Sequence, residues 1–521
     1  MPCSASATDL AAPWSHPESG EFTPQELANT AWAFAKRAIS DEPLMDAIAA
    51  SAIRKINQLN TQELSNTALA YATLIVFNAP LLEAISSAAL RRISAGAADN
   101  QALSNTPWAF SKLEFQDCPL RASISSAAIS RISEFVPQGL SNLAWSLAKW
   151  NEVDMPLFEA ISAESIRKLR VLNSQDLSNT LWALAKLELR DMPLLEALSA
   201  ESIRKIREFN PQSIANTAWA LATLDIRDQP LLNALASEAI NKIPDFNVQA
   251  LSNLAWALSR LEFLHEPLFA AISSEAMRII SAFDAQALSN TLWAFARLGL
   301  QNTPLSSAIA SAAIAMQTEL TTQELSNLAW ALAKLWNHHM PLLQAISAQA
   351  LPNISELNKQ ELSVIAWAFA TLGLRPRPLL EAIASQAIAR ITALGMLEIS
   401  NTSWAFARLA ERNETLMAAI SAQALAPHGE GMEATGAGAA ASAAAGADVA
   451  NANGIYSIVW SAWRSVRPQL SYALYRQPPP KAAAHEPLVH GLLIMDSEWG
   501  RDAMTAQHTR ARLGLAPAGH D

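Results

Sequence analysis

An asparagine, a tryptophan and a basic residue recur along the chain at one fixed spacing. SNTLWALAKL stands at 178–187, SNTLWAFARL at 289–298, SNLAWALAKL at 326–335 and SNTSWAFARL at 400–409. An indole can stack on any nucleic-acid base, and an amide can form hydrogen bonds with base edges or with the sugar–phosphate backbone. A cation can pair with a phosphate. These side chains indicate single-stranded nucleic acid, provided that one surface presents them together.

The tryptophans mark a repeat. Nine of them follow one another at intervals of 37 residues: Trp108, Trp145, Trp182, Trp219, Trp256, Trp293, Trp330, Trp367 and Trp404. Leu69 takes the same position 39 residues before Trp108, and Trp32 precedes Leu69 by 37. Eleven repeats therefore span residues 23–427. A period of this length with two helices per unit predicts a right-handed all-α solenoid.

Each repeat divides into two helices, called helix A and helix B. Helix A follows residue types that cap helix N-termini, namely Thr23, Asn60, Asp99, Asn173, Asn210, Asn247, Asp284, Thr321 and Asn358. Val136 and Gly395 break this column. Helix B begins near a proline, which suits a first turn because no amide bond is needed there. These prolines are Pro43, Pro80, Pro119, Pro156, Pro193, Pro230, Pro267, Pro304, Pro341 and Pro378.

Four positions of helix A form a stripe on the side opposite its core leucines. In the fifth repeat, the apolar stripe that should face helix B comprises Leu177, Thr180, Leu184 and Leu187. The opposite stripe has the spacing i, i+4, i+7 and i+11 and comprises Gln175, Asn179, Trp182 and Lys186. The same set recurs as Gln249, Asn253, Trp256 and Arg260, and as Gln286, Asn290, Trp293 and Arg297.

The basic column of this stripe is the candidate phosphate contact. It comprises Lys36, Lys112, Lys149, Lys186, Arg260, Arg297, Lys334 and Arg408, with Thr73, Thr223 and Thr371 in the other repeats. In a solenoid, one row of helices lines the concave surface, and these stripes would then form a ladder of amides, indoles and cations.

A structural role is the alternative for part of this pattern. The tryptophan could wedge between neighbouring A helices, and the asparagine could form a buried ladder between repeats. A core position would not alternate between lysine, arginine and threonine. Because an invariant column cannot distinguish bases, the position before the first leucine of helix A is the best candidate for base recognition. It varies as Glu26, Glu63, Ala102, Gly139, Asp176, Ser213, Ala250, Ala287, Glu324, Glu361 and Glu398.

Charge and composition limit the other functions. The chain of 521 residues has a net charge of −10, and residues 21–427 carry 30 basic against 37 acidic side chains. Many acids fall in helix B or in the A–B loops, the latter at Asp117, Asp154, Asp191 and Asp228. Two distant cysteines, Cys3 and Cys118, exclude a disulfide framework and a cysteine zinc cluster. The sequence carries no pattern typical of a catalytic site, so we expect no catalytic residues, no metal, no cofactor and no enzyme activity.

The remaining segments are assigned from composition. We expect a disordered N-terminal segment at 1–22, a disordered Ala/Gly-rich linker at 428–454 and a C-terminal tail of unknown role at 455–521. His485 and His490 in the tail lack the spacing of a metal motif. No apolar run is strong enough to span a membrane, and the N-terminus lacks the features of a signal or transit peptide.

The repeats resemble a known family. Units such as LSNTLWALAKL at 177–187, followed by a second helix that starts with proline, resemble the octotricopeptide repeats of organellar RNA-binding proteins. They are also similar to the helical repeats that precede RAP domains and occur in FAST-kinase-like proteins. The resemblance implies single-stranded RNA as a partner, other proteins of an RNA-processing complex, and a role in chloroplast or mitochondrial RNA processing, stability or translation.

Two functions of different class follow. The first is a single-stranded RNA-binding module, favoured by the stripe and by the placement of the acids away from it. The second is a protein-interaction scaffold, favoured by the acidic balance of the repeats.

Overall fold

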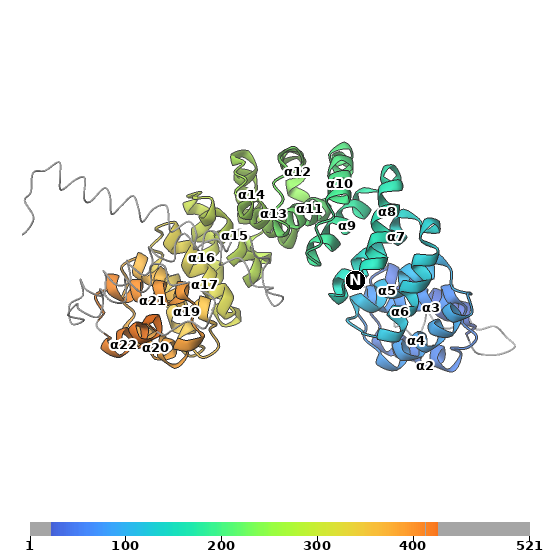
Figure 1. The fold of residues 1–521 in the computed structure, drawn as a ribbon, viewed down its shortest axis with the longest axis horizontal. Helices are drawn as coiled ribbons and strands as arrows, with labels where there is room; N and C mark the ends of the chain where they lie inside the picture. The colour runs from blue at the N-terminus through green and yellow to red at the C-terminus, as the bar shows by residue number, and fades with distance from the viewer. Residues whose placement is uncertain (1–21, 412, 426–521) are drawn as a thin grey trace, which may run out of the picture. The chain divides into compact units, whose positions relative to one another are not determined.

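The repeats form a row of paired helices. The computed structural model describes residues 22–411 and 413–425, so the predicted N-terminal segment, linker and tail lie outside the described residues. Within these ranges there are 22 α-helices and no strand, and helices neighbouring in the chain pack in series (Figure 1). The predicted all-α solenoid is confirmed. None of the described helices combines the length and the apolar character needed to cross a membrane.

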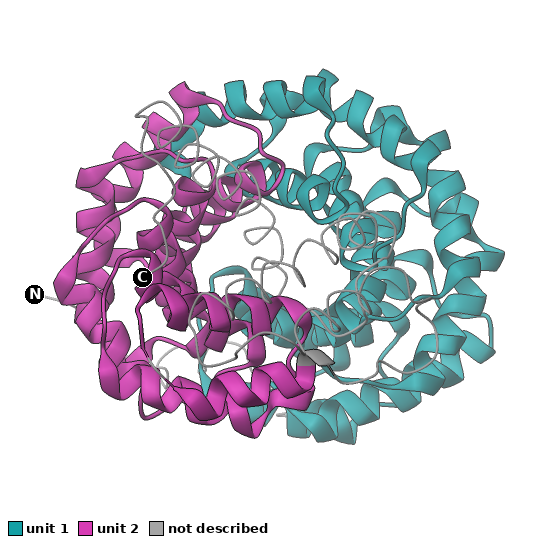
Figure 2. Ribbon diagram, turned by 60° about the vertical axis from the view of Figure 1, so that its left-hand side comes forward, with its two compact units in different colours: residues 1–246 teal, residues 247–521 magenta. Residues whose placement is uncertain are grey.

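The chain divides at a repeat boundary into two compact units, residues 1–246 and 247–521 (Figure 2). The A helices of unit 1 are α1 (Pro24–Lys36), α3 (Thr61–Leu74), α5 (Asn100–Lys112), α7 (Pro137–Trp150), α9 (Ser174–Lys186) and α11 (Pro211–Thr223). Its B helices are α2 (Glu42–Arg54), α4 (Ala79–Ser94), α6 (Cys118–Ser130), α8 (Met155–Arg167), α10 (Met192–Arg204) and α12 (Gln229–Lys242).

Unit 2 continues the same order. Its A helices are α13 (Val248–Arg260), α15 (Ala285–Arg297), α17 (Thr322–Lys334), α19 (Lys359–Thr371) and α21 (Met396–Arg408). Its B helices are α14 (Glu266–Arg278), α16 (Thr303–Ala315), α18 (Met340–Ala350), α20 (Arg377–Ala389) and α22 (Glu414–Leu425). Short 3₁₀ turns follow most B helices, for example η3 (Leu169–Val171), η4 (Ile206–Glu208) and η6 (Ile280–Ala282).

Within each unit the A helices pack more closely on one another than the B helices do. Small residues make this possible: Ser178, Ala183 and Ala185 of α9 are buried. The predicted core stripe of α9 is also buried, with Leu177 and Leu184 fully inaccessible. Because one row is tighter than the other, each unit curves with its A helices on the inside.

The cap column of helix A is confirmed. Side chains such as Asn173 and Asn210 accept from first-turn amides, and Val136 and Gly395 make no such bond. The acids of the A–B loops cap helix B instead: Asp191 accepts from the Leu194 amide. Asp191 also accepts a hydrogen bond from Ser162 of the preceding B helix. The same pair of bonds occurs at Asp117, Asp154 and Asp228.

In most repeats a basic residue at the end of helix B bonds to the last residues of the preceding repeat. Lys168 donates to the carbonyl oxygens of Ser133 at 2.7 Å and Phe135 at 2.6 Å. Equivalent bonds come from Lys55, Arg92, Arg131, Lys205, Lys242 and Arg390. The column is interrupted in unit 2, where Ile279, Met316 and Asn353 occupy it.

Candidate nucleic-acid interface

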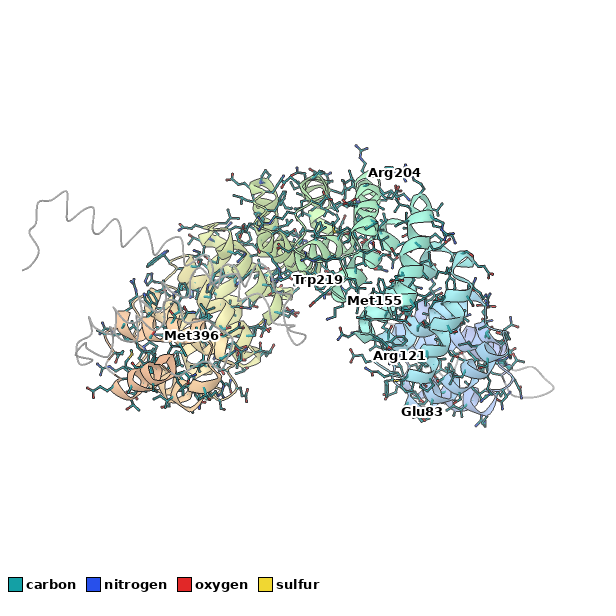
Figure 3. The ribbon with its side chains drawn as sticks, viewed as in Figure 1. Glu83, Arg121, Met155, Arg204, Trp219 and Met396 are labelled. Atoms are coloured by element: carbon teal, nitrogen blue, oxygen red, sulfur yellow. The ribbon has the colours of Figure 1, made fainter. Side chains whose placement is uncertain are left out.

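The predicted stripe lies on the exposed side of the A helices. We call this surface the A face and define it by the glutamine, asparagine, tryptophan and basic columns. In α9, Gln175 and Lys186 are exposed, while Asn179 and Trp182 are half-buried. Figure 3 labels Trp219 of α11 on this side of unit 1 and Arg204 at the end of α10 on the opposite side. The structure therefore places all four columns together in each repeat.

The tryptophans stack on one another from repeat to repeat. In unit 1 the ring centroids of Trp108, Trp145, Trp182 and Trp219 are 5.8, 5.9 and 6.2 Å apart in succession, with interplanar angles of 27–33°. In unit 2, Trp293 and Trp330 are 5.8 Å apart and both are 1% exposed. A base inserted between two rings would need about 7 Å, twice the stacking rise of nucleic-acid bases. The indoles are therefore closed to intercalating bases in these pairs.

The basic column lies over its own tryptophans. The Nζ of Lys112 is 4.9 Å from the Trp108 ring centroid, and burial lowers the pKa of Lys112. Arg260 lies 5.5 Å from the Trp256 ring, a distance typical of cation–π contacts. The same contact occurs at Lys36, Arg297 and Arg408.

Some of these cations are also held by protein groups. Lys149 is 3.1 Å from Glu114. Arg297 is buried, donates to the Ser259 carbonyl at 3.0 Å and lies 3.5 Å from Glu262. Arg408 donates to the Ala370 carbonyl at 3.0 Å. Lys186 is exposed and forms no ion pair with any residue that the structure describes. The cations thus differ in how readily a phosphate could reach them.

The side-chain amides of the asparagine column form no ladder. Among residues 22–411 and 413–425, no side-chain amide of the asparagine column forms a hydrogen bond with another protein group. The column includes Asn179, Asn253 and Asn290, which are half-buried. The glutamine column, including Gln175, Gln249 and Gln286, is exposed in the first eight repeats. The asparagines therefore form no hydrogen-bonded ladder between repeats. The half-buried members keep donors and acceptors that a ligand could reach, whereas Asn105, Asn327 and Asn401 are buried.

The prediction that the position before the first leucine of helix A recognises bases is wrong. Asp176 and Ser213 are each 3% exposed, and Ala250 is 6% exposed, because this position faces the neighbouring A helix. Ser141 donates to Asp176 at 2.9 Å, and Ser178 lies 3.2 Å from Ser213. Burial raises the pKa of Asp176. The position is buried in eight of the eleven repeats. In the other three, Glu26, Glu63 and Glu324 are half-buried and bind the backbone amide of their own helix cap.

The sequence places the acids of helix B away from the basic column but does not predict their partners. The structure shows that Glu201 and Glu238 are buried and paired. Glu201 contacts Arg204 and Lys205, and Glu238 lies 2.9 Å from Lys242. Their charges are compensated on the outer row of helices. Acids just after the A helices, such as Glu114, do lie beside the basic column, and the repeat pattern did not indicate this.

The structure offers no grouping typical of a metal centre. Among the described residues, no three His, Cys, Asp or Glu side chains come together to hold an ion. Cys118 is exposed and unpaired by disulfide. His338 and His339 lie in an A–B loop, where His339 caps α18.

The fold and the A face define a helical-repeat protein of the α-solenoid class. The chain belongs to the family of the RNA-editing substrate-binding complex 6 protein, whose model matches residues 15–192, 191–303 and 295–430. These matches cover the eleven repeats, so the repeats themselves carry the family relationship. The family is associated with RNA, and the octotricopeptide family itself is not shown.

The comparisons with curated proteins and with solved structures give no further family. No curated protein matches the chain. Among solved structures, a homology model of the full-length AP-3 complex in an intermediate open conformation is similar at 10% identity and a TM-score of 0.32. The alignment covers 92% of this chain and 90% of that chain.

Proposed function

We propose that the protein binds single-stranded RNA on its A face and acts by binding rather than by catalysis. The observation that carries this proposal is the presence of unpartnered asparagine amides beside a column of cations on successive A helices. Such groups suit the sugar–phosphate backbone of a single strand. Membership of an RNA-associated family supports the same conclusion.

The test is the salt dependence of RNA binding. Lys112 and Lys186 form no ion pair with described residues, and Thr73 and Thr223 show that threonine fits their position. Each lost phosphate contact should make the slope of log K against log salt shallower by roughly 0.7 for a single strand. The double variant Lys112→Thr/Lys186→Thr should therefore bind more weakly, with a slope shallower by about 1.4, as measured by fluorescence anisotropy.

A matched control removes two charges from the outer row. In the sixth repeat Asn241 takes the position of Arg167 and Arg204 and contacts Glu238 at 3.4 Å. The double variant Arg167→Asn/Arg204→Asn therefore changes the net charge equally without touching the A face. Its slope should equal that of the parent. If the slope of log K against log salt became equally shallow in both variants, the cause would be a general charge effect, and the proposed site would be contradicted.

A protein-interaction scaffold is the second candidate. The ion pair of Lys149 with Glu114 favours it, because a phosphate would have to compete with that carboxylate. The acidic balance of the repeats favours it too. A folded parent that binds no single-stranded RNA at low salt would leave the scaffold as the better function. The organellar location implied by the octotricopeptide resemblance stays a prediction, which fractionation of cells would test.

A further inference from the structure

We propose that the A face binds single-stranded RNA without distinguishing base sequence. This inference rests on the proposed RNA binding and specifies its substrate class: any unpaired strand, held by its backbone. The inference follows from two properties of each column of the repeat: whether its side chains are exposed, and whether its residue type varies between repeats.

The exposed columns hardly vary. Glutamine and asparagine each occur in ten of the eleven repeats, with Leu397 and Val364 as the exceptions. The basic column alternates only among lysine, arginine and threonine, which contact backbone oxygens rather than one particular base. A strand moved by one repeat would therefore meet the same groups. Equal groups at each position give equal binding energies for any order of bases.

The varying columns are engaged mainly by contacts within the protein. The position of Asp176 and Ser213 is enclosed between A helices. A second varying position, the first residue of helix A, contacts the 3₁₀ turn that closes its own repeat: Asn100 donates to Glu134 at 3.2 Å, and Ser174 donates to the Glu208 carbonyl at 3.0 Å. The side chains that vary between repeats are thus engaged within the protein, and we infer that they do not select a ligand.

The indoles add no base selectivity. Stacking is sequence-tolerant even where it occurs, because every base has a π face. In unit 1 the faces of Trp145 and Trp182 are already occupied by the neighbouring rings at 5.8–6.2 Å. Affinity should come mainly from backbone contacts and counterion release, so it should grow with strand length and fall with salt.

The experiment compares RNAs that differ only in base order. Two single strands of equal length and composition, without self-complementarity, are titrated into the full chain at one salt concentration. We expect dissociation constants within about threefold of each other. A preference of about tenfold or more, which corresponds to ~1.4 kcal/mol, would overturn the inference.

A variant tests the varying column directly. Ser213→Ala places in α11 the residue that Ala250 and Ala287 already provide in other repeats. It should leave the ratio of the two dissociation constants unchanged, and a changed ratio would show that this column selects bases. Absence of binding to either RNA at low salt would refute the proposed function together with this inference. Tight binding with a strong preference would refute the inference alone.

Discussion

At the scale of single residues, a tryptophan of the A face could stabilise the row of A helices, contact RNA, or do both. Trp182 stacks on Trp145 and Trp219, and its side chain is half-buried. An aromatic pair contributes about 0.5–1.5 kcal/mol beyond the area that it buries. The ladder therefore stabilises the row of A helices whether or not RNA is bound.

The variant Trp182→Leu should separate these roles. Leu69 shows that leucine fits this position. Loss of two ring contacts should lower the free energy of unfolding by about 1–3 kcal/mol, measured by urea denaturation. The dissociation constant for single-stranded RNA should change less than about threefold, because the cations and amides remain. A variant of unchanged stability that loses RNA binding would mean that the indole contacts bases after all.

The sequence predicts which residues share the A face, because spacing along a helix sets the direction of each side chain. Gln175, Asn179, Trp182 and Lys186 were placed together on that basis. It does not predict which positions are covered by the neighbouring repeat. The burial of Asp176 depends on how closely two A helices approach, and this distance is a property of the packed array. The partners of Lys149 and Arg297 come from preceding repeats for the same reason.

At the scale of elements, every A helix ends in the same turn. The first or second residue after the helix has a positive φ in all eleven repeats, and its amide and the next one bond back to carbonyl oxygens of the last turn. In the fifth repeat these bonds run from Glu188 to Ala185 and from Leu189 to Leu184. This pattern is a Schellman motif, and it fixes the direction in which helix B departs.

This turn could not be predicted from the residues that form it. Glycine is the usual residue at a positive φ, but only Gly299 and Gly373 provide it, and the other nine repeats use residues such as Ala38, Ile75 and Glu188. The helix caps and prolines, by contrast, were predicted because their residue types follow the chemistry of a helix end.

The variant Glu188→Gly should therefore stabilise unit 1. A residue other than glycine in the left-handed region costs about 1 kcal/mol or more, so its removal should raise the free energy of unfolding by about that amount. The reverse change, Gly299→Ala, should lower the stability of unit 2 by about as much, since an added Cβ meets no atom within 4 Å and only the backbone strain remains. Urea denaturation of both variants is the measurement. Shifts of the same sign in the two would contradict the argument.

At the scale of the whole molecule, stability is the sum of nearest-neighbour contacts, and these contacts are unequal. In unit 1 a basic residue lies at or just after the end of each of the B helices α2, α4, α6, α8, α10 and α12. It binds a carbonyl oxygen just before the A helix of its own repeat. A hydrogen bond to a charged group contributes about 1.5–3 kcal/mol. In unit 2, Ile279 and Met316 carry no side-chain donor and cannot form this bond. We expect amide hydrogens of η6 (Ile280–Ala282) to exchange faster than those of η4 (Ile206–Glu208).

The variant Met316→Arg should restore the missing bond. Arg131 donates to the Ala98 carbonyl, 33 residues before it, at 2.6 Å, and Arg390 bonds to Leu357 in the same way at 2.7 Å. The equivalent acceptor for position 316 is the carbonyl of Phe283, which follows η6. Hydrogen exchange in residues 280–288 should therefore slow by about tenfold or more, the effect of ~1.4 kcal/mol of added local stability. Met316→Leu, which keeps the apolar contact and adds no donor, should exchange at the parental rate. Equal slowing in both variants would assign the effect to packing, and no slowing in Met316→Arg would show that the basic column does not hold neighbouring repeats together.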